Sequence, residues 1–396
     1  MENLPLIIIP GFGQSKAELV KENGDKVRVW PLSVDIKQTA KRIAPSYIKT
    51  VIRRRDTGFT DTAYKIFSEV FEPFAPDENG NMIHPLQAIP CDTPLSECSE
   101  KFRGFVKKLV PIGDYGDKYG YDKIYFFSYN AFDDVYLTAE KLDCFIDKVI
   151  AETGSQKVNL LSYSMGGPVT TAYLDEYRHK ACIGKILFVA AAIEGSALQA
   201  DVLKRYVDKA QGYSFLGFVT TEKTVDIFKK VLALTPWEVR YRLLFRSLDA
   251  VNDVVLINSA GMWELVPPKD YPKLRDKFIG DDNHAVLRSK TDRYHKTALR
   301  VREILTDVKN KGTELFSVAG YGSTIMPLSL SRELSTDTIL DISSSSLGGV
   351  DNGEVNLDGS FFKDNIRLFK GIGHGEFAKN PEVNDIALRF FSGDKL

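Results

Sequence analysis

The stretch N-L-L-S-Y-S-M-G-G-P, residues 159–168, decides the fold of this chain. It joins a largely apolar segment, Lys157–Leu161, to a segment that suits a helix, Val169–Tyr177. A serine on a sharp turn between a strand and a helix is the arrangement that G-x-S-x-G motifs mark, because the strained turn exposes the hydroxyl above a sheet. Here Ser162 stands in place of the first glycine, and Ser164 is the motif serine. The pattern predicts Ser164 as a nucleophile; the alternative is a buried strand-to-helix turn in another α/β fold.

The bulk composition is that of an ordinary globular protein. The chain has 396 residues, 43% hydrophobic and 27% charged, with a formal net charge of -1. No basic excess or basic block favours a nucleic-acid partner, and no segment is long and apolar enough to span a bilayer. The first residues lack the basic and apolar regions of a signal peptide. We therefore expect a cytoplasmic protein without a nucleic-acid partner or a transmembrane segment, and transient contact with a membrane surface stays open.

The cysteines do not form a disulfide scaffold. Cys91 and Cys98 lie close together in a loop-like stretch and could pair in an oxidising compartment, whereas Cys144 and Cys182 lie in apolar runs typical of a core. No cysteine and histidine spacing resembles a zinc site, so we expect no metal and no cofactor. The cysteine usage favours a reduced compartment.

Apolar runs and helical patterns alternate along much of the chain. Leu6–Ile9 is a continuous apolar run, as expected for a strand buried on both faces of a parallel sheet. Strands and helices alternate from residue 120 to about 195, which indicates βαβ units. Further strands are expected at Val27–Pro31, Glu314–Val318 and Asn365–Phe369, and further helices at Asp292–Val308 and Pro381–Phe391.

These patterns predict an α/β fold with a mostly parallel central sheet, helices on its flanks and an inserted helical cap. Residues 1–196 form the first part of the core, with an insertion at about 37–115. Residues 197–285 break the alternation and are rich in aromatic and aliphatic side chains, so we expect them to form the cap. Residues 286–396 form the second part of the core.

A serine nucleophile needs a base, and His374 has the best position. In α/β-hydrolases the chain order is serine, acid, histidine, and His374 follows the last predicted strand in G-I-G-H-G-E, residues 371–376. Flanking glycines leave the imidazole in an accessible loop. The alternative is a solvated loop histidine, and the other histidines are expected at the surface or with their hydrogen bonds satisfied.

The acid of such a triad should follow the strand Glu314–Val318. Asp351, in G-V-D-N-G-E-V-N, residues 349–356, is the natural candidate. Its carboxylate would accept a hydrogen bond from Nδ1 of His374 and fix the tautomer of the imidazole. The alternative is that Asp351, Asn352 and Gly353 simply form a turn.

An oxyanion hole needs two backbone N–H groups. One should come from Met165, the residue after the nucleophile, and the other from Phe12 in the loop P-G-F-G, residues 10–13. The alternative is a plain turn that ends the first strand.

With these segments in order, the chain resembles the lecithin:cholesterol acyltransferase family, which includes lysosomal phospholipase A, within the α/β-hydrolase superfamily. The segment V-N-L-L-S-Y-S-M-G-G, residues 158–167, is similar to the family's V-N-L-x-x-H-S-M-G-G, with Tyr163 where a histidine is usual. I-I-I-P-G-F-G, residues 7–13, looks like its opening strand and oxyanion loop. V-A-G-Y-G-S-T, residues 318–324, is similar to its later Gly-Tyr-Gly loop.

The chain also departs from the family's pattern. An ungapped match to the family's acid motif, G-D-G-T-V-N, places Asn352 on the aspartate. One extra residue restores Asp351, which we prefer because a neutral amide cannot stabilise an imidazolium. The family's Y-D-W-R segment appears only as Tyr129 and Asn130, so details of substrate binding do not carry over.

The resemblance implies a serine hydrolase or acyltransferase that acts on acyl esters of lipids through an acyl-enzyme. Ser164, His374 and Asp351 would form its triad, with no cofactor and a lipid or ester as partner. Two alternatives stay open: a small-ester or peptide hydrolase, and a non-catalytic lipid-binding relative whose acid has become Asn352. The apolar stretches Phe67–Phe74 and Tyr213–Val219 are expected to dock on lipid, with packing in the core as the alternative.

Overall fold

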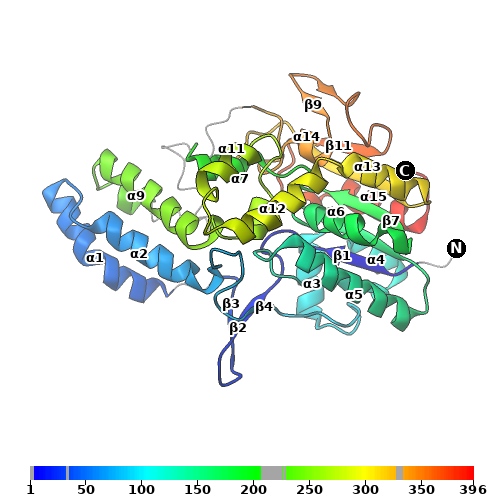
Figure 1. Cartoon of the computed structure of the whole chain (residues 1–396), viewed down its shortest axis with the longest axis horizontal. Helices are drawn as coiled ribbons and strands as arrows, with labels where there is room; N and C mark the ends of the chain where they lie inside the picture. Colours follow the sequence, from blue (N-terminus) through cyan, green and yellow to red (C-terminus); the bar gives the residue numbers. More distant parts are fainter. Residues whose placement is uncertain (1–3, 33–34, 207–225, 227–228, 327–332) are drawn as a thin grey trace.

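A six-stranded parallel sheet forms the centre of the molecule. The structure is a computed structural model that describes residues 4–32, 35–206, 226, 229–326 and 333–396. The strand order is β11-β8-β7-β6-β1-β5, and every pair in it is parallel (Figure 1). The strands are β1 (Leu6–Ile9), β5 (Ile124–Phe126), β6 (Val158–Tyr163), β7 (Ile183–Val189), β8 (Glu314–Tyr321) and β11 (Ile366–Lys370).

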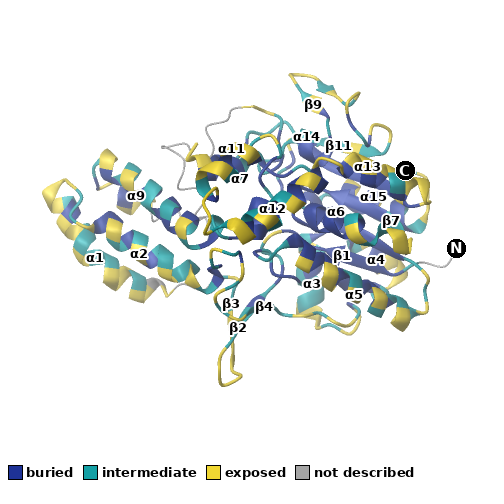
Figure 2. Cartoon of the chain, viewed as in Figure 1, coloured by how far each residue is buried: buried dark blue, intermediate teal, exposed yellow. Residues whose placement is uncertain are grey.

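Strand β1 explains why the apolar run at the start of the chain is continuous. Ile7 and Ile9 pack into one hydrophobic core, and Leu6 and Ile8 pack into the core on the opposite face. All four side chains are fully buried because helices cover both faces of the sheet (Figure 2). On the first face lie α5 (Val135–Thr153), α6 (Gly166–Tyr177), α12 (Ala285–Ala298) and α13 (Val301–Asn310), and on the second α3 (Glu100–Leu109), α4 (Gly113–Tyr119) and α15 (Pro381–Ser392).

This architecture confirms the expected α/β-hydrolase fold, with two corrections to individual elements. The predicted strand at Val27–Pro31 is β3 (Lys26–Trp30), which lies outside the main sheet. It pairs with β2 (Ala17–Val20), and β2 pairs with β4 (Leu86–Ala88), in a separate antiparallel sheet. The predicted helix at Asp292–Val308 is two helices, α12 and α13, because the chain turns tightly between them.

A helical arm extends from the core, away from the sheet (Figure 1). It consists of α1 (Ile36–Arg53), α2 (Phe59–Phe71) and α9 (Trp237–Val251). Helices α2 and α9 pack closely, and ion pairs join Arg242 to Asp56 and Arg246 to Asp61. The apolar core of the arm is made by Phe59, Ala63, Leu232, Val239, Leu243, Leu244 and Leu248. The predicted insertion at about 37–115 and the predicted cap at 197–285 therefore meet in one structure, although their boundaries as domains stay a prediction.

The other described parts of the predicted cap are short helices near the carboxyl ends of the strands. Ser196 N–H donates to the carbonyl of Leu265, and the Ser259 hydroxyl donates to the carbonyl of Phe132. The predicted lipid-docking stretch Tyr213–Val219 lies outside the described residues. The remaining elements are η1 (Glu72–Phe74), η2 (Arg178–Lys180), α7 (Ala197–Lys204), η4 (Asn252–Leu256), α10 (Ala260–Trp263), α11 (Tyr271–Phe278), α14 (Ile342–Ser345), β9 (Val350–Asp351), β10 (Val355–Asn356) and η5 (Phe377–Lys379).

One buried carboxyl group links these helices to the core. Glu264 follows α10 and is buried, and its Oε1 accepts a hydrogen bond of 2.9 Å from the N–H of Val135 at the start of α5. Its other oxygen has no hydrogen-bond partner among the described residues. Burial, together with the charges of Asp134 and Asp133, raises the pKa of Glu264 well above its usual value of 4.5.

We expect Glu264→Gln to stabilise the protein increasingly as the pH rises. A carboxyl group with a raised pKa in the folded state stabilises the fold fully below its unfolded pKa and loses that contribution as the pH rises towards its folded pKa. Glutamine keeps the oxygen acceptor for Val135 but does not ionise. Denaturant unfolding across this pH range should show a variant advantage that grows by at most about 1.4 kcal/mol per pH unit.

The exposed Glu238, in the first turn of α9, is the matched control. Glu238→Gln removes a carboxylate that solvent reaches, and it should not reproduce the advantage that Glu264→Gln gains as the pH rises. Identical pH profiles for Glu264→Gln and the parent protein would contradict the assignment of a raised pKa to Glu264.

Candidate active site

Ser164 lies on a strained turn between β6 and α6. Its φ of 52° is in the left-handed region, which a non-glycine residue seldom adopts. The turn is held by hydrogen bonds from Ser164 N–H to the carbonyl of Val189, and from the N–H groups of Gly167 and Ala192 to the carbonyl of Ser164. This geometry is that of a nucleophile elbow, and it places the serine at the carboxyl end of the central strands.

Small residues around Ser164 allow the backbone segments to approach closely. A Cβ atom at Gly166 would lie 2.5 Å from the carbonyl oxygen of Ile9, and one at Gly11 would lie 2.8 Å from Cβ of Ser164. Ser162 is tolerated in place of the usual glycine because its buried hydroxyl accepts a hydrogen bond from Thr170 in α6. The departure from G-x-S-x-G therefore keeps the elbow intact.

The structure brings His374 to Ser164, as predicted from the chain order. His374 lies between β11 and α15, and its Nε2 is 2.9 Å from Oγ of Ser164. This distance is within the range in which an imidazole removes a proton from a hydroxyl. The two residues meet although more than half of the chain separates them.

Asp337 is the carboxylate that faces His374. Its Oδ2 lies 2.8 Å from Nδ1 of His374, and the side chain is fully buried. Oδ1 accepts hydrogen bonds from the N–H groups of Ile339 and Leu340, at 3.0 and 2.8 Å. The N–H of His374 also donates to the backbone carbonyl of Asp337 at 2.7 Å. A carboxylate at Nδ1 holds the proton there, so Nε2 is free to accept the serine proton.

The prediction of Asp351 as the acid is wrong, because Nδ1 of His374 is bonded to Asp337. Asp351 belongs to the hairpin of β9 and β10, and its Oδ1 accepts a hydrogen bond of 3.0 Å from the N–H of Gly353. Asn352 is exposed in the same turn. The Asp-Asn-Gly sequence therefore forms a local turn, which was the alternative interpretation. Asp337 also lies in the segment that follows β8, where the acid was expected. The sequence marks it only weakly, as an aspartate that can accept hydrogen bonds from the backbone N–H groups that follow it.

Two backbone N–H groups are placed to form an oxyanion hole. Met165 directly follows Ser164 in the chain. The loop that contains Phe12 is close to Ser164, because its neighbour Gly11 packs against the Ser164 side chain. Among the described residues, neither the N–H of Phe12 nor that of Met165 donates a hydrogen bond to another group. The loop is fixed by a hydrogen bond from Gly11 N–H to the Gln14 side chain. Their role as oxyanion donors stays a prediction.

An apolar wall borders the nucleophile. The rings of Phe12 and Phe132 contact edge to face at 5.5 Å, and Phe132 packs with Phe74 at 5.4 Å. Phe74, Phe132 and Met165 belong to one buried cluster, whereas Phe12 remains 42% exposed. Phe12 therefore presents an apolar surface on the loop that approaches Ser164 through Gly11.

The predicted docking stretch Phe67–Phe74 largely packs inside the protein. Phe74 is buried in the cluster beside the nucleophile, and Phe71 is partly buried against it. Phe67 packs on the core of the arm. Packing in the core, the alternative interpretation of this aromatic stripe, is what the structure supports.

The other histidines have local partners. His84 pairs with Glu72, Nδ1 of His179 lies 3.1 Å from a backbone carbonyl, and His284 pairs with Asp281. His295 is buried, and desolvation lowers its pKa to about 4. Among the described residues, no group of three or more histidine, cysteine, aspartate or glutamate side chains is placed to hold a metal ion.

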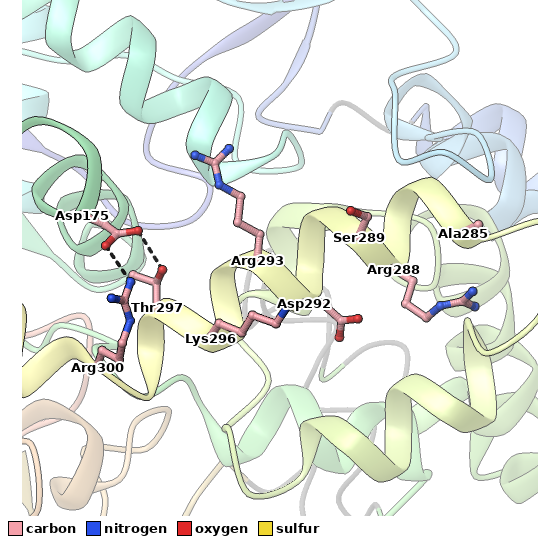
Figure 3. Close-up of a pocket in the computed structure, with 9 residues that line it drawn as sticks. All are labelled: Asp175, Ala285, Arg288, Ser289, Asp292, Arg293, Lys296, Thr297 and Arg300. Carbon is pink, nitrogen blue, oxygen red and sulfur yellow. Dashed lines mark hydrogen bonds and ion pairs between the residues drawn. The ribbon is translucent and has the colours of Figure 1, made fainter.

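A surface pocket of about 470 Å³ opens over α12, but none of the three site residues lines it. Its lining is strongly charged: Asp175 of α6 accepts hydrogen bonds from Thr297 and Arg300, and Arg288, Arg293 and Lys296 also line the pocket (Figure 3). Most of these cations already pair with protein groups, as Arg293 does with Glu176. The pocket is therefore separate from the chemistry at Ser164.

Comparisons with known proteins give similarities of structure only. No family model and no curated protein matches the chain. It is similar to the mature Bacillus licheniformis lipase BlEst2, at 12% identity and a TM-score of 0.34 over 71% of this chain and 84% of that one. It is also similar to the phospholipase PlaB of Legionella pneumophila, at 15% identity and a TM-score of 0.35 over 70% and 54%. A third similar structure is the α/β hydrolase MGS-M2 from a deep-sea metagenome library, at 10% identity and a TM-score of 0.31 over 77% and 88%.

Asp337→Ala should lower the rate of turnover of an activated soluble ester by about 10⁴-fold, because the imidazolium loses its carboxylate. Asp351→Ala is the matched control, since it removes a carboxylate from the same part of the chain. It should leave kcat almost unchanged. A large loss at Asp351 together with a normal rate at Asp337 would contradict the assignment.

Tyr163 also contacts His374, through the backbone of the loop that carries the imidazole. Its buried hydroxyl donates a hydrogen bond to the backbone carbonyl of His374, and the two rings lie 5.7 Å apart. Burial, and secondarily the charge of Asp337, raises the pKa of Tyr163. Tyr163 therefore fixes the loop that carries the imidazole and is a positioning residue.

Tyr163→Phe should lower kcat on a soluble ester by about 10²-fold while KM changes little, because a small displacement of the imidazole is costly. Tyr173→Phe is the matched control: it removes another buried hydroxyl, which lies 3.3 Å from Sγ of Cys182. Both variants should lose a similar free energy of unfolding, about 1 kcal/mol. Equal kcat values for the two variants would show that Tyr163 has only a structural role.

Proposed function

We propose that this protein is a serine hydrolase that cleaves carboxylic esters through an acyl-enzyme. The observation that carries the proposal is the continuous contact from Ser164 Oγ to His374 Nε2, and from His374 Nδ1 to Asp337, at 2.9 and 2.8 Å. A nucleophile, a base and an orienting carboxylate in this order are the arrangement that acyl transfer requires.

In the first half of the reaction, Oγ of Ser164 attacks the ester carbonyl carbon while Nε2 of His374 takes the hydroxyl proton. The carbonyl oxygen becomes an oxyanion, which the N–H groups of Phe12 and Met165 stabilise. The ester C–O bond then breaks, and Nε2 gives its proton to the leaving alcohol. The carboxylate of Asp337 accepts the hydrogen bond from Nδ1 and stabilises the imidazolium.

In the second half, water attacks the acyl-enzyme. Nε2 of His374 takes one proton from the water, and the oxyanion forms again in the same place. When the bond between the acyl carbon and Oγ breaks, Nε2 returns the proton to Ser164 and the carboxylic acid leaves. A lipid alcohol in place of water would give acyl transfer, so the two outcomes share every step up to the acyl-enzyme.

The acyl group is proposed to be a long apolar chain, as in a lipid ester. The choice is supported by Phe12, which is half-exposed on the loop that approaches Ser164, and by the apolar cluster that contains Phe132 and Met165. A small-ester hydrolase would have less need of such a surface. The alternative of a non-catalytic relative assumed that Asn352 had replaced the acid of the triad. That assumption is no longer needed, because the buried carboxylate of Asp337 contacts His374.

A series of nitrophenyl esters with increasing acyl length tests the proposed substrate class. We expect kcat/KM to rise by up to about fourfold per methylene, because burial of each methylene contributes about 0.8 kcal/mol. Ser164→Ala should reduce every rate to the background, and its thermal midpoint should stay close to that of the parent protein. A kcat/KM that is greatest for acetate and falls with length would contradict the lipid-ester class but leave the hydrolase intact.

Phe12→Ala locates the acyl-binding surface, since it keeps the backbone N–H of residue 12. It should lower kcat/KM for long-chain esters about tenfold or more, in line with the lost burial of an aromatic side chain, and affect acetate little. Ile83→Ala removes another exposed apolar side chain and is the control. Equal losses on short and long esters would contradict an acyl-binding role for Phe12.

A further inference from the structure

The free end of the helical arm brings together two segments that are far apart in the sequence. The last turns of α1 and the start of α9 both lie at this end, farthest from the sheet (Figure 1). The hydroxyl of Tyr47 donates a hydrogen bond of 2.7 Å to the carbonyl of Val231, so the two segments adjoin. We define the arm tip as residues 48–55 and 229–237.

Large apolar side chains of the arm tip face solvent. Ile48 and Ile52 are one helical turn apart on α1, so they share a face, and Ile52 is 72% exposed. On the adjoining segment, Leu234 is 63% exposed. The exposed apolar residues of the tip are Ile48, Ile52, Val231, Leu234 and Trp237. Single exposed apolar residues need no explanation, but a group of this size at one end of a protrusion indicates a contact surface.

Cations surround this apolar group. The basic residues of the arm tip are all exposed, and none forms an ion pair with a described residue: Lys49, Arg53, Arg54, Arg55, Lys229 and Lys230. Fewer acidic groups lie here. Glu238 and Asp226 are exposed, and Asp56 is paired with Arg242. The arm tip therefore carries an excess of positive charge, although the whole chain has a formal net charge of -1.

We propose that the arm tip docks on an anionic lipid surface. Aliphatic side chains and a tryptophan enter the boundary between head groups and acyl chains, while the surrounding lysine and arginine side chains bind anionic head groups. The charge is complementary to such a surface. The tip is the end of a protrusion, so it reaches a flat surface before the core does. No described helix is long and apolar enough to cross a membrane.

Vesicle co-sedimentation of the full chain tests the docking site without any dependence on catalysis. The measurements use Ser164→Ala protein, which cannot alter the lipid. We expect binding to vesicles of phosphatidylcholine with phosphatidylserine, and at least about tenfold weaker binding to phosphatidylcholine alone, because each basic residue near an anionic surface contributes about 1 kcal/mol. Added salt should weaken the binding.

Two pairs of substitutions separate the apolar and the cationic contributions. Ile52→Glu with Leu234→Glu should abolish binding, and Arg53→Glu with Arg55→Glu should lower it at least about tenfold. These positions are exposed, so the thermal midpoint should stay close to that of the parent protein. The controls are Leu299→Glu, at a leucine that is 76% exposed on the core, and Lys21→Glu with Lys37→Glu away from the tip.

Three results would overturn the proposal: no binding to anionic vesicles, equal binding by the tip variants and the controls, or self-association of the parent protein that the tip variants abolish. The last would make the tip an interface between two copies of this chain. The same substitutions should also be made in protein that keeps Ser164. Those variants should hydrolyse a soluble ester at the rate of the parent protein. Failure of lipid binding with normal turnover would therefore leave the proposed hydrolase standing.

Discussion

Three hydrogen bonds hold His374, one at its imidazole and two at its backbone, and the rest of the site depends on this restraint. Asp337 binds it twice, through the carboxylate at Nδ1 and through the backbone carbonyl at the His374 N–H. Tyr163 binds the carbonyl of His374 from the end of β6. Because Ser164 follows Tyr163 directly, the contact that fixes the base also relates it to the nucleophile.

The central sheet provides the rigidity that this arrangement requires. β1 is buried on both faces, and β6 lies between β1 and β7, so hydrogen bonds on both edges hold the strand that ends at Tyr163. The left-handed conformation of Ser164 is unfavourable by itself, and it persists because hydrogen bonds from Gly167 and Ala192 fix its carbonyl. Asp337 and His374 come from the loops that follow β8 and β11, which are neighbours in the sheet.

The fold, the turn at Ser164 and the position of His374 were predictable from the sequence. A continuous apolar run marks Leu6–Ile9 as a doubly buried strand, small residues mark the turn at Ser164, and chain order selects His374. Asp337 was missed because an acid in a triad is defined by a distant partner, while Asp-Asn-Gly at Asp351 carries a strong local turn signal. The family resemblance strengthened that error.

The helical arm was not predictable for a similar reason. α2 and α9 are each amphipathic. They are far apart in the sequence, since α2 precedes strands β5, β6 and β7 and α9 follows them, yet they pack together. Sequence periodicity gives the buried face of a helix and not the helix that covers it. The arm tip could not be predicted from the sequence either, because its two segments adjoin only when the helices of the arm pack together. The resemblance to the lecithin:cholesterol acyltransferase family stays a prediction, since no family model matches the chain.

We propose that Ser164 is the nucleophile and that His374 activates it, across the 2.9 Å contact between Nε2 and Oγ. The most direct test is to treat the protein with a fluorophosphonate, digest it and locate the adduct by mass spectrometry. We expect an adduct on Ser164 in the parent protein and none in His374→Ala under the same conditions, with a thermal midpoint of the variant close to that of the parent protein as the check that it is folded. An adduct on Ser162 or another serine, or unchanged labelling of Ser164 in His374→Ala, would contradict the proposal.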